Sequence, residues 1–354
     1  MNDPKLTFAQ RLIQARKMRG LSLRALAEKM EGRVSYNALH KYEQGLMMPD
    51  SEVLTSIADA LDQDLDFFFR EPAVELKEVR FRKISRLGAK QEQAIREQAT
   101  DYFERYREID RIVGMPVGFQ NPLTNFRIKK PEDVETAADK VRANWNLGED
   151  PLPNVREMLE SKGVFIFETE APESFDGFSG HADGQPMIVL GKWLNNDLPR
   201  KRFTELHEIG HVLLDFDRSF SEKDQERLCH RFAGAMLMPK NVFVQEFGGV
   251  RKRVSIAELV DLKERYGISI AAIMHRAFDL GLITAALYER FCISYKKHRW
   301  HKGEPGQYTG REISSRFEQL VLRAASEGIV SQTKGAALLN EPLVDFRERL
   351  VGIG

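Results

Sequence analysis

The segment RFTELHEIGH, residues 202–211, holds two histidines four residues apart, with a glutamate directly after the first of them. In a helix, residues i and i+4 lie on one face, so His207 and His211 can direct both imidazole rings at one ion. Glu208 lies about 100° further round such a helix, where it reaches a water molecule on the ion more easily than the ion itself. This spacing is typical of a metal site with a general base that activates water for attack on a carbonyl group.

A third ligand is needed to complete such a site, and the sequence offers Glu226 in DQERLCHRFAGAMLMP. The spacing predicts one helix at roughly 199–216 and a second at 221–237, joined by LLDFDRSFSE. If these helices run antiparallel, Glu226 comes close to the two histidines. Two histidines and one glutamate leave a fourth position open, which is the arrangement of catalytic zinc sites. Zinc is therefore the expected cofactor, and Mn²⁺ or iron accepts the same ligands.

Two further residues of the second predicted helix lie beside these ligands. His230 follows Glu226 by four residues and therefore shares its face of the helix. We expect His230 to act in the site as a catalytic, orienting or polarising group rather than as a ligand. The alternative is a structural histidine bonded to a backbone carbonyl. Cys229 is interpreted as a buried small residue and not as a ligand.

The elements around this segment change from helical to strand-like spacing and back. PEDVETAADKVRANWNL and PNVREMLESKG show helical spacing of apolar residues. VFIFE, FSGHAD and PMIVL are short, β-rich runs separated by turn residues, so they predict a small sheet. Helical spacing returns after residue 253 and continues toward the end of the sequence. The expected fold class is therefore mainly α with a small β-sheet, an α+β fold.

The first 70 residues predict a separate bundle of short helices. Ser22, Ser35 and Ser51 are each placed to cap a helix, and glycines separate the helical runs. In a helix-turn-helix, the second helix lies in the major groove of DNA, and here that helix is SYNALHKYE. Its apolar face predicts that Ala38 and Leu39 pack in the core together with Tyr42, while polar side chains face outward.

The outward-facing side chains of this bundle have the chemistry that binds phosphates and reads base edges. The candidate DNA-contacting residues are Arg24, Ser35, Tyr36, Asn37, His40 and Lys41. The formal net charge of the whole chain is zero, but residues 1–49 carry nine Lys or Arg against four Asp or Glu. A basic head of this kind fits double-stranded DNA. Because such heads bind two half-sites, we also expect a homodimer.

The head resembles a lambda-repressor-like helix-turn-helix domain of the XRE type. The resemblance rests on GLSLRALAEKM, VSYNALHKYEQG and EVLTSIADALDQDLDFF, which occur in this order. Two features depart from that pattern. Leu23 stands where a polar residue is usual early in the second helix, and the turn EGRV before the recognition helix is longer than usual. The departures affect the expected DNA contacts and not the expected fold.

The centre of the chain resembles the ImmA/IrrE metallopeptidase family. The resemblance rests on RFTELHEIGH and on ERLCHRFAGAMLMP, with FSGHADGQPMIVL before them and LVDLKERYGISIAAIMHRAFDLGLI after them. It implies a zincin-like, gluzincin-type domain in which His207, His211 and Glu226 bind the metal and Glu208 is the catalytic base. It also implies cleavage of a repressor of the helix-turn-helix type, and it places the strand PMIVL at the sheet edge that pairs with an extended substrate.

These resemblances lead to a four-part division of the chain. Residues 1–70 are expected to be the DNA-binding domain and 71–115 a helical linker. Residues 116–250 are expected to be the metallopeptidase domain, and 251–354 a C-terminal helical region without a chemical motif. No apolar run is long enough to span a membrane. The two cysteines and the absence of an apolar leader in the first residues favour a cytoplasmic protein.

Three hypotheses about function follow. The first is a DNA-guided zinc endopeptidase that cleaves a transcriptional regulator or itself in a stress, phage or mobile-element response, with activity restrained at rest. The second is an operator-binding repressor whose peptidase-like domain senses a metal, a ligand or a partner without proteolysis. The third is a toxin–antitoxin type of regulator whose C-terminal helices bind a second protein. Glu208 favours the first hypothesis, because a sensor has no need of a base.

Overall fold

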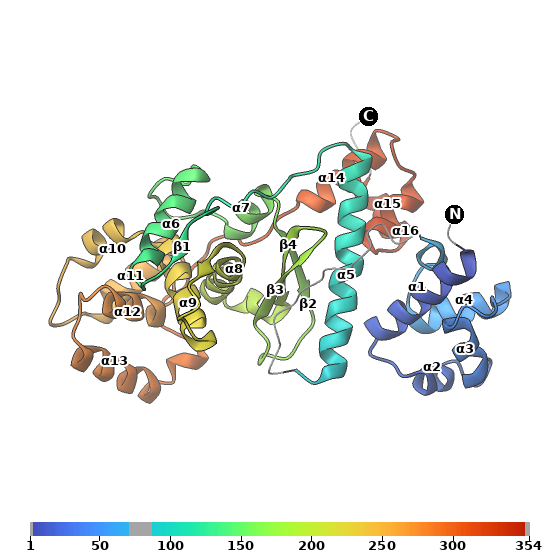
Figure 1. The fold of residues 1–354 in the computed structure, drawn as a ribbon, viewed down its shortest axis with the longest axis horizontal. Coiled ribbons are helices and arrows are strands. Elements are labelled where there is room, and N and C mark those ends of the chain that lie inside the picture. The colour runs from blue at the N-terminus through green and yellow to red at the C-terminus, as the bar shows by residue number, and fades with distance from the viewer. Residues whose placement is uncertain (1–2, 71–86, 351–354) are drawn as a thin grey trace. The chain divides into compact units, whose positions relative to one another are not determined.

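The computed structural model describes residues 3–70 and 87–350, which form two compact units (Figure 1). Within these described residues, the first unit contains 3–70, 87–117 and 315–350, and the second unit contains 118–314. The second unit is thus inserted between two parts of the first along the chain. Helices dominate, with a small sheet in the second unit, which confirms the expected fold class. No helix in the described part of the chain is long and apolar enough to cross a membrane.

The N-terminal part of the first unit is a bundle of short helices around an apolar core. Its elements are α1 (Pro4–Met18), α2 (Leu23–Lys29), α3 (Tyr36–Glu43), α4 (Ser51–Leu61) and the 3₁₀ helix η1 (Leu65–Phe69). Ser22 and Ser35 cap α2 and α3 through their hydroxyl oxygens, as the sequence predicts. The predicted cap Ser51 is wrong, because the Asp50 carboxylate accepts the Val53 N–H and Ser51 is already helical.

The long turn between α2 and α3 has a defined structure. Glu31 and Gly32 both adopt positive φ angles, of 55° and 76°. This left-handed conformation is readily accessible to glycine, and it reverses the chain after α2. Val34 is then buried in the core of the bundle, which fixes the start of α3. The additional turn residues therefore leave the two helices packed in the same bundle.

Helix α5 (Ala89–Ile112) packs with the N-terminal bundle and with the C-terminal helices in the first unit (Figure 1). The C-terminal helices are α14 (Arg316–Ser326), α15 (Gln332–Leu339) and α16 (Leu343–Arg349). The buried Arg11 guanidinium of α1 lies 2.5 Å from the Glu104 carboxylate of α5. Arg316 donates to the Tyr106 hydroxyl over 2.9 Å on another face of α5. Of the predicted linker 71–115, residues 71–86 lie outside the described residues, and the remainder is largely α5.

The second unit surrounds a pair of adjacent helices, α8 (Leu198–Leu213) and α9 (Glu222–Leu237). Helices α6 (Asp133–Asn144) and α7 (Val155–Ser161) precede them, with the 3₁₀ helix η2 (Lys192–Asn196) before α8. The elements that follow are α10 (Lys240–Phe247), α11 (Ile256–Tyr266), α12 (Ile270–Asp279), α13 (Ala285–Lys297) and η3 (Trp300–Lys302). Apolar residues of most of these elements form one continuous core.

The sheet of the second unit lies beside α8. Within the described residues it has three strands, β2 (Phe165–Thr169), β4 (Gln185–Gly191) and β3 (Gly177–Ala182), in that spatial order. β2 is parallel to β4, whereas β3 is antiparallel to it. The expectation that PMIVL is the edge strand is wrong, since these residues belong to the central strand β4. FSGHA, in β3, lies at the edge instead. The short strand β5 (Asp215–Phe216) follows the end of α8 and pairs in parallel with β1 (Arg127–Ile128).

A buried carboxylate joins three helices of the second unit. Glu135 of α6 accepts hydrogen bonds from Arg231 of α9 over 2.8 Å and from Arg276 of α12 over 2.8 Å. Burial alone raises the pKa of this carboxyl. The guanidinium groups of Arg276 and Arg231 outweigh burial and hold the pKa of Glu135 below its usual value. The carboxylate therefore contributes stability above the unfolded pKa of about 4.3, and that contribution is lost as the pH falls through the lower folded pKa.

We predict that Glu135→Gln destabilises the second unit by about 3 kcal/mol at pH 7, because two buried guanidinium groups lose their counter-charge. All three tryptophans of the chain lie in residues 118–314. Urea unfolding followed by tryptophan fluorescence therefore reports on this unit. The difference from wild type must shrink at pH values below the folded pKa of Glu135. Glu132→Gln, at an exposed position of the same helix start, is the control and leaves the midpoint unchanged. If the difference in unfolding free energy between Glu135→Gln and wild type does not change with pH, the charge of Glu135 is not what stabilises this unit.

Candidate functional site

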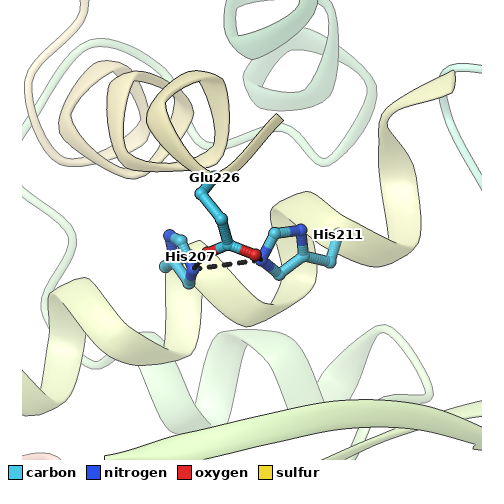
Figure 2. A group of neighbouring side chains, drawn as sticks. All are labelled: His207, His211 and Glu226. Atoms are coloured by element: carbon cyan, nitrogen blue, oxygen red, sulfur yellow. Dashed lines mark hydrogen bonds and ion pairs between the residues drawn. The ribbon is translucent and has the colours of Figure 1, made fainter. Parts of the chain in front are cut away.

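Three side chains from α8 and α9 converge on one point, as Figure 2 shows. The Nε2 atoms of His207 and His211 lie 3.0 Å apart. The two carboxylate oxygens of Glu226 lie 3.2 Å from Nε2 of His207 and 3.4 Å from Nε2 of His211. The i, i+4 spacing on α8 places both rings on one face, and the loop after α8 returns the chain so that α9 carries the glutamate to them. The sequence predicts this convergence.

The spacing of these donor atoms fits a bound divalent ion. Four ligands at about 2.0 Å around a tetrahedral ion are separated from one another by about 3.3 Å. The three distances of 3.0, 3.2 and 3.4 Å match that separation closely. His207 is buried, whereas His211 and Glu226 are partly exposed, so one side of the group is open to solvent. The residues therefore fit a His₂Glu metal site with an accessible fourth position.

The predicted base, Glu208, lies next to this group and is held by the edge strand of the sheet. It is only 7% exposed, and its Oε2 atom accepts a hydrogen bond from Ser179 Oγ over 2.8 Å. Ser179 lies in β3 and is itself buried. Ser179 is not among the site residues predicted from the sequence. A polar residue at a buried position of FSGHAD was the available signal, but its partner depends on how the sheet packs against α8.

The His230 ring lies between the His₂Glu group and a neighbouring aromatic ring. Its centroid is 4.3 Å from that of His207 and 5.8 Å from that of Phe203, with which it is stacked. The residue as a whole is exposed to solvent, but desolvation of its ring, reinforced by His207, lowers the pKa of His230 to about 4, so the ring is neutral at pH 7. Within the described residues, no backbone carbonyl forms a hydrogen bond with it, so the structural alternative finds no support.

Cys229 is buried, as predicted, and it also contacts the His211 ring. Its side chain is fully buried, and its Sγ atom lies 2.9 Å from Nδ1 of His211. The imidazole of His211 therefore has Glu226 on its Nε2 side and a sulfur on its Nδ1 side. No local sequence pattern indicates this contact, because it depends on the rotation of α9 relative to α8.

A cavity of about 1260 Å³ adjoins the site. Phe203 and His230 line the end of this cavity that is nearest the metal-binding group. Tyr288 and Tyr295 of α13 line another wall, together with Trp300. No residue of α13 is buried, so its aromatic side chains remain available on the cavity side. The cavity has the size and mixed polarity to receive several side chains of a larger molecule.

A cluster of buried charged side chains fixes α8. Arg202 forms an ion pair with Glu312, and both side chains are fully buried. The same guanidinium group donates to the Tyr308 hydroxyl over 2.9 Å. Glu205 of α8 lies in this region, where burial and the negative charge of Glu312 raise its pKa to about 8. Glu205 is therefore protonated at pH 7, and it does not line the cavity. The segment after η3 thus holds the helix that carries the histidines.

Helix α3 presents the predicted division between core and solvent. Leu39 and Tyr42 are buried in the core, and Ala38 packs against it. The predicted DNA-contacting residues are all exposed: Arg24 on α2, and Ser35, Tyr36, Asn37, His40 and Lys41 at α3. The Tyr36 ring stacks on that of His40, with centroids 6.2 Å apart. The Ser35 hydroxyl is already engaged in capping α3.

The matches to known families agree with these two sites. Residues 159–278 match the model of the M78 peptidase family, described as an IrrE N-terminal-like domain. Residues 12–68 match a helix-turn-helix family model. The first range includes the His₂Glu group, and the second includes α3. No curated protein matches the chain. The chain therefore combines a helix-turn-helix domain of the XRE type with an IrrE-like peptidase domain.

We predict that the purified protein binds about one equivalent of zinc or manganese through the His₂Glu group. Glu226→Ala removes one ligand and weakens binding at least 100-fold, as measured by competition with a chromogenic chelator. Glu222→Ala, at an exposed position in the first turn of the same helix, is the matched control and retains wild-type affinity. Equal affinities of wild type and Glu226→Ala contradict the assignment of the third ligand.

Proposed function

We propose that this chain, in which a helix-turn-helix domain is joined to an IrrE-like peptidase domain, is a DNA-binding transcription regulator with a metal-dependent endopeptidase activity. Its substrate is a repressor-type regulator or a copy of the chain itself, cleaved in a stress or mobile-element response. The observation that carries this proposal is the position of Glu208, held by Ser179 beside a complete His₂Glu group. A site that only stores or senses a metal has no need of a fixed carboxylate there.

Each residue of the site has a role in peptide hydrolysis under this proposal. A bound zinc or manganese ion supplies a Lewis acid that polarises the scissile carbonyl and makes water more acidic. Glu208 accepts the proton of the attacking water at its carboxylate and returns it to the leaving amine. Ser179 fixes the direction of that carboxylate through its hydrogen bond. The neutral ring of His230 offers an N–H to the oxygen on which negative charge develops.

The edge strand and the cavity supply the surroundings that an extended substrate needs. β3 has β4 on one side and, among the described residues, no strand on the other. An extended peptide can add to that free edge by backbone hydrogen bonds, along the strand whose Ser179 holds Glu208. The adjoining cavity then receives side chains on one side of the scissile bond, and Phe203 with Tyr288 favours bulky apolar ones.

The helix-turn-helix domain places the chain on an operator in this proposal. Asn37 and Lys41 are exposed on α3, where asparagine can pair with adenine and lysine with guanine or phosphate. Arg24 lies 5.9 Å from the Tyr36 ring and contributes positive charge next to the same face. A homodimer would place two such helices in successive major grooves.

We predict that Glu208→Gln lowers the rate of cleavage by about 10²–10⁴-fold, because the amide cannot accept the proton. Metal affinity and operator affinity stay at wild-type values, since Glu208 binds neither partner. The measurement is cleavage of helix-turn-helix repressors, and of the chain itself, followed by gel and mass spectrometry. If wild type loaded with metal cleaves nothing and Glu208→Gln leaves regulation in cells unchanged, the sensor hypothesis replaces this one.

We predict different effects for two residues of α3 on DNA binding. Lys41→Ala weakens binding to all sequences and lowers the slope of log affinity against log salt by about 1, because one phosphate contact is lost. Asn37→Ala relaxes base preference by about 1–3 kcal/mol at one position. Titrations on operator and random duplexes at several salt concentrations separate the two effects. Lys240→Ala, at an exposed position of the second unit, is the control. If this variant loses as much DNA affinity as Lys41→Ala, then α3 is not the DNA-contacting helix.

A further inference from the structure

The sulfur of Cys229 lies on the opposite side of the His211 ring from the metal-binding group. Cys229 follows Glu226 by three residues on α9, and its Sγ atom is 2.9 Å from Nδ1 of His211. Glu226 approaches Nε2 of the same ring. One helix thus contacts both nitrogens of one imidazole, with a carboxylate at one and a thiol sulfur at the other.

The tautomer of His211 determines whether it can bind a metal. An imidazole that offers the lone pair of Nε2 to an ion carries its proton on Nδ1, and that N–H then requires an acceptor. Within the described residues, Cys229 Sγ is placed to accept it, and a sulfur atom has lone pairs to do so. In the opposite tautomer, Nε2 carries the proton and cannot coordinate. When Nε2 binds an ion, the contact with Cys229 satisfies the Nδ1–H and also fixes the plane of the ring.

The packing of α8 against α9 makes this contact possible at the position next to His211. A Cβ atom at Gly210 would lie 3.6 Å from Sγ of Cys229 and 3.2 Å from a ring carbon of Phe232. The two helices can approach this closely because Gly210 has no side chain. The space that remains fits a small residue, and among small residues only those with a polar γ atom can accept a hydrogen bond there.

The second histidine of the group, His207, has no such acceptor at its Nδ1 atom within the described part of the chain. Nδ1 of His207 is buried and has no hydrogen-bond partner among the residues that the structure describes. Cys229 is also not a fourth ligand, because the two ring nitrogens face different directions and a sulfur at Nδ1 lies away from an ion at Nε2. The group of potential ligands contains His207, His211 and Glu226 alone within the described residues.

We propose that Cys229 is a positioning residue of the metal centre, whose sulfur accepts the Nδ1–H of His211 and so orients this ligand. The inference rests on the proposed metal site and adds to it a residue that binds neither metal nor substrate. Under this proposal, the buried thiol of Cys229 is small enough for the contact between α8 and α9 and also accepts a hydrogen bond there. Acceptors at this position typically change metal affinity by about 10–100-fold.

The test compares three substitutions at Cys229 by their affinity for zinc alone, measured by chelator competition on the full chain. Cys229→Ala removes the acceptor and weakens zinc binding by about 10–100-fold. Cys229→Val fills the space without an acceptor and weakens binding similarly. Cys229→Ser restores an acceptor, so its affinity stays close to wild type. Cys292→Ala, the other cysteine of the chain, is the matched control and has no effect.

The metal-free melting temperature, followed by tryptophan fluorescence, separates positioning from packing. Support requires that the alanine and valine variants lose affinity while the serine variant keeps it, whatever their melting temperatures. The inference is overturned if Cys229→Ala binds zinc like wild type, or if Cys229→Ser is as weak as Cys229→Ala. Should the alanine variant fail to fold, the valine and serine variants decide by the same comparison. Failure of the proposed function looks different, because wild type itself then binds no metal or Glu208→Gln cleaves normally.

Discussion

The close approach of α8 and α9 is the constraint on which the site depends. His207 and His211 come from one helix and Glu226 from the other, and the donor atoms lie 3.0–3.4 Å apart. A shift of either helix by 1 Å is large on that scale, so the surrounding elements have to prevent it. Glu135 joins α9 to α6 and α12 through buried charges. Arg202 holds α8 through the segment that follows η3. Buried charges on both helices thus fix this helix crossing within the second unit.

Local spacing explains why the convergence of His207, His211 and Glu226 could be predicted from the sequence. The i, i+4 relation of His207 and His211 is independent of the rest of the fold, and α9 follows α8 after a short loop. Ser179 could not be predicted, since it is 29 residues distant from Glu208 and meets it through the order of the strands. The spatial order β2-β4-β3 is also the reason why FSGHA lies at the edge of the sheet and PMIVL does not. The contact of Cys229 depends on the rotation of a helix, which no local pattern encodes.

Two buried acids of the second unit are held in opposite states of protonation. Glu135 is fully paired with two guanidinium groups, so its pKa is lowered although it is buried. Glu205 has no hydrogen-bond partner among the described residues and lies near another carboxylate, so its pKa is raised to about 8. Burial opposes charge at both positions, and the geometry of the partners decides the outcome. Neither state is visible in the sequence, where both are glutamates within helices.

The order of the two units along the chain limits what a single cut can release. The second unit enters after residue 117 and leaves before residue 315, so two covalent tethers connect it to the first unit. Breaking one peptide bond at either junction leaves the other tether intact. Helices α5 and α14 remain in one body through contacts such as Arg316 with Tyr106. Physical separation of the DNA-binding unit from the peptidase unit at these junctions therefore requires two breaks. A single nick there produces a chain in two pieces that still behaves as one particle.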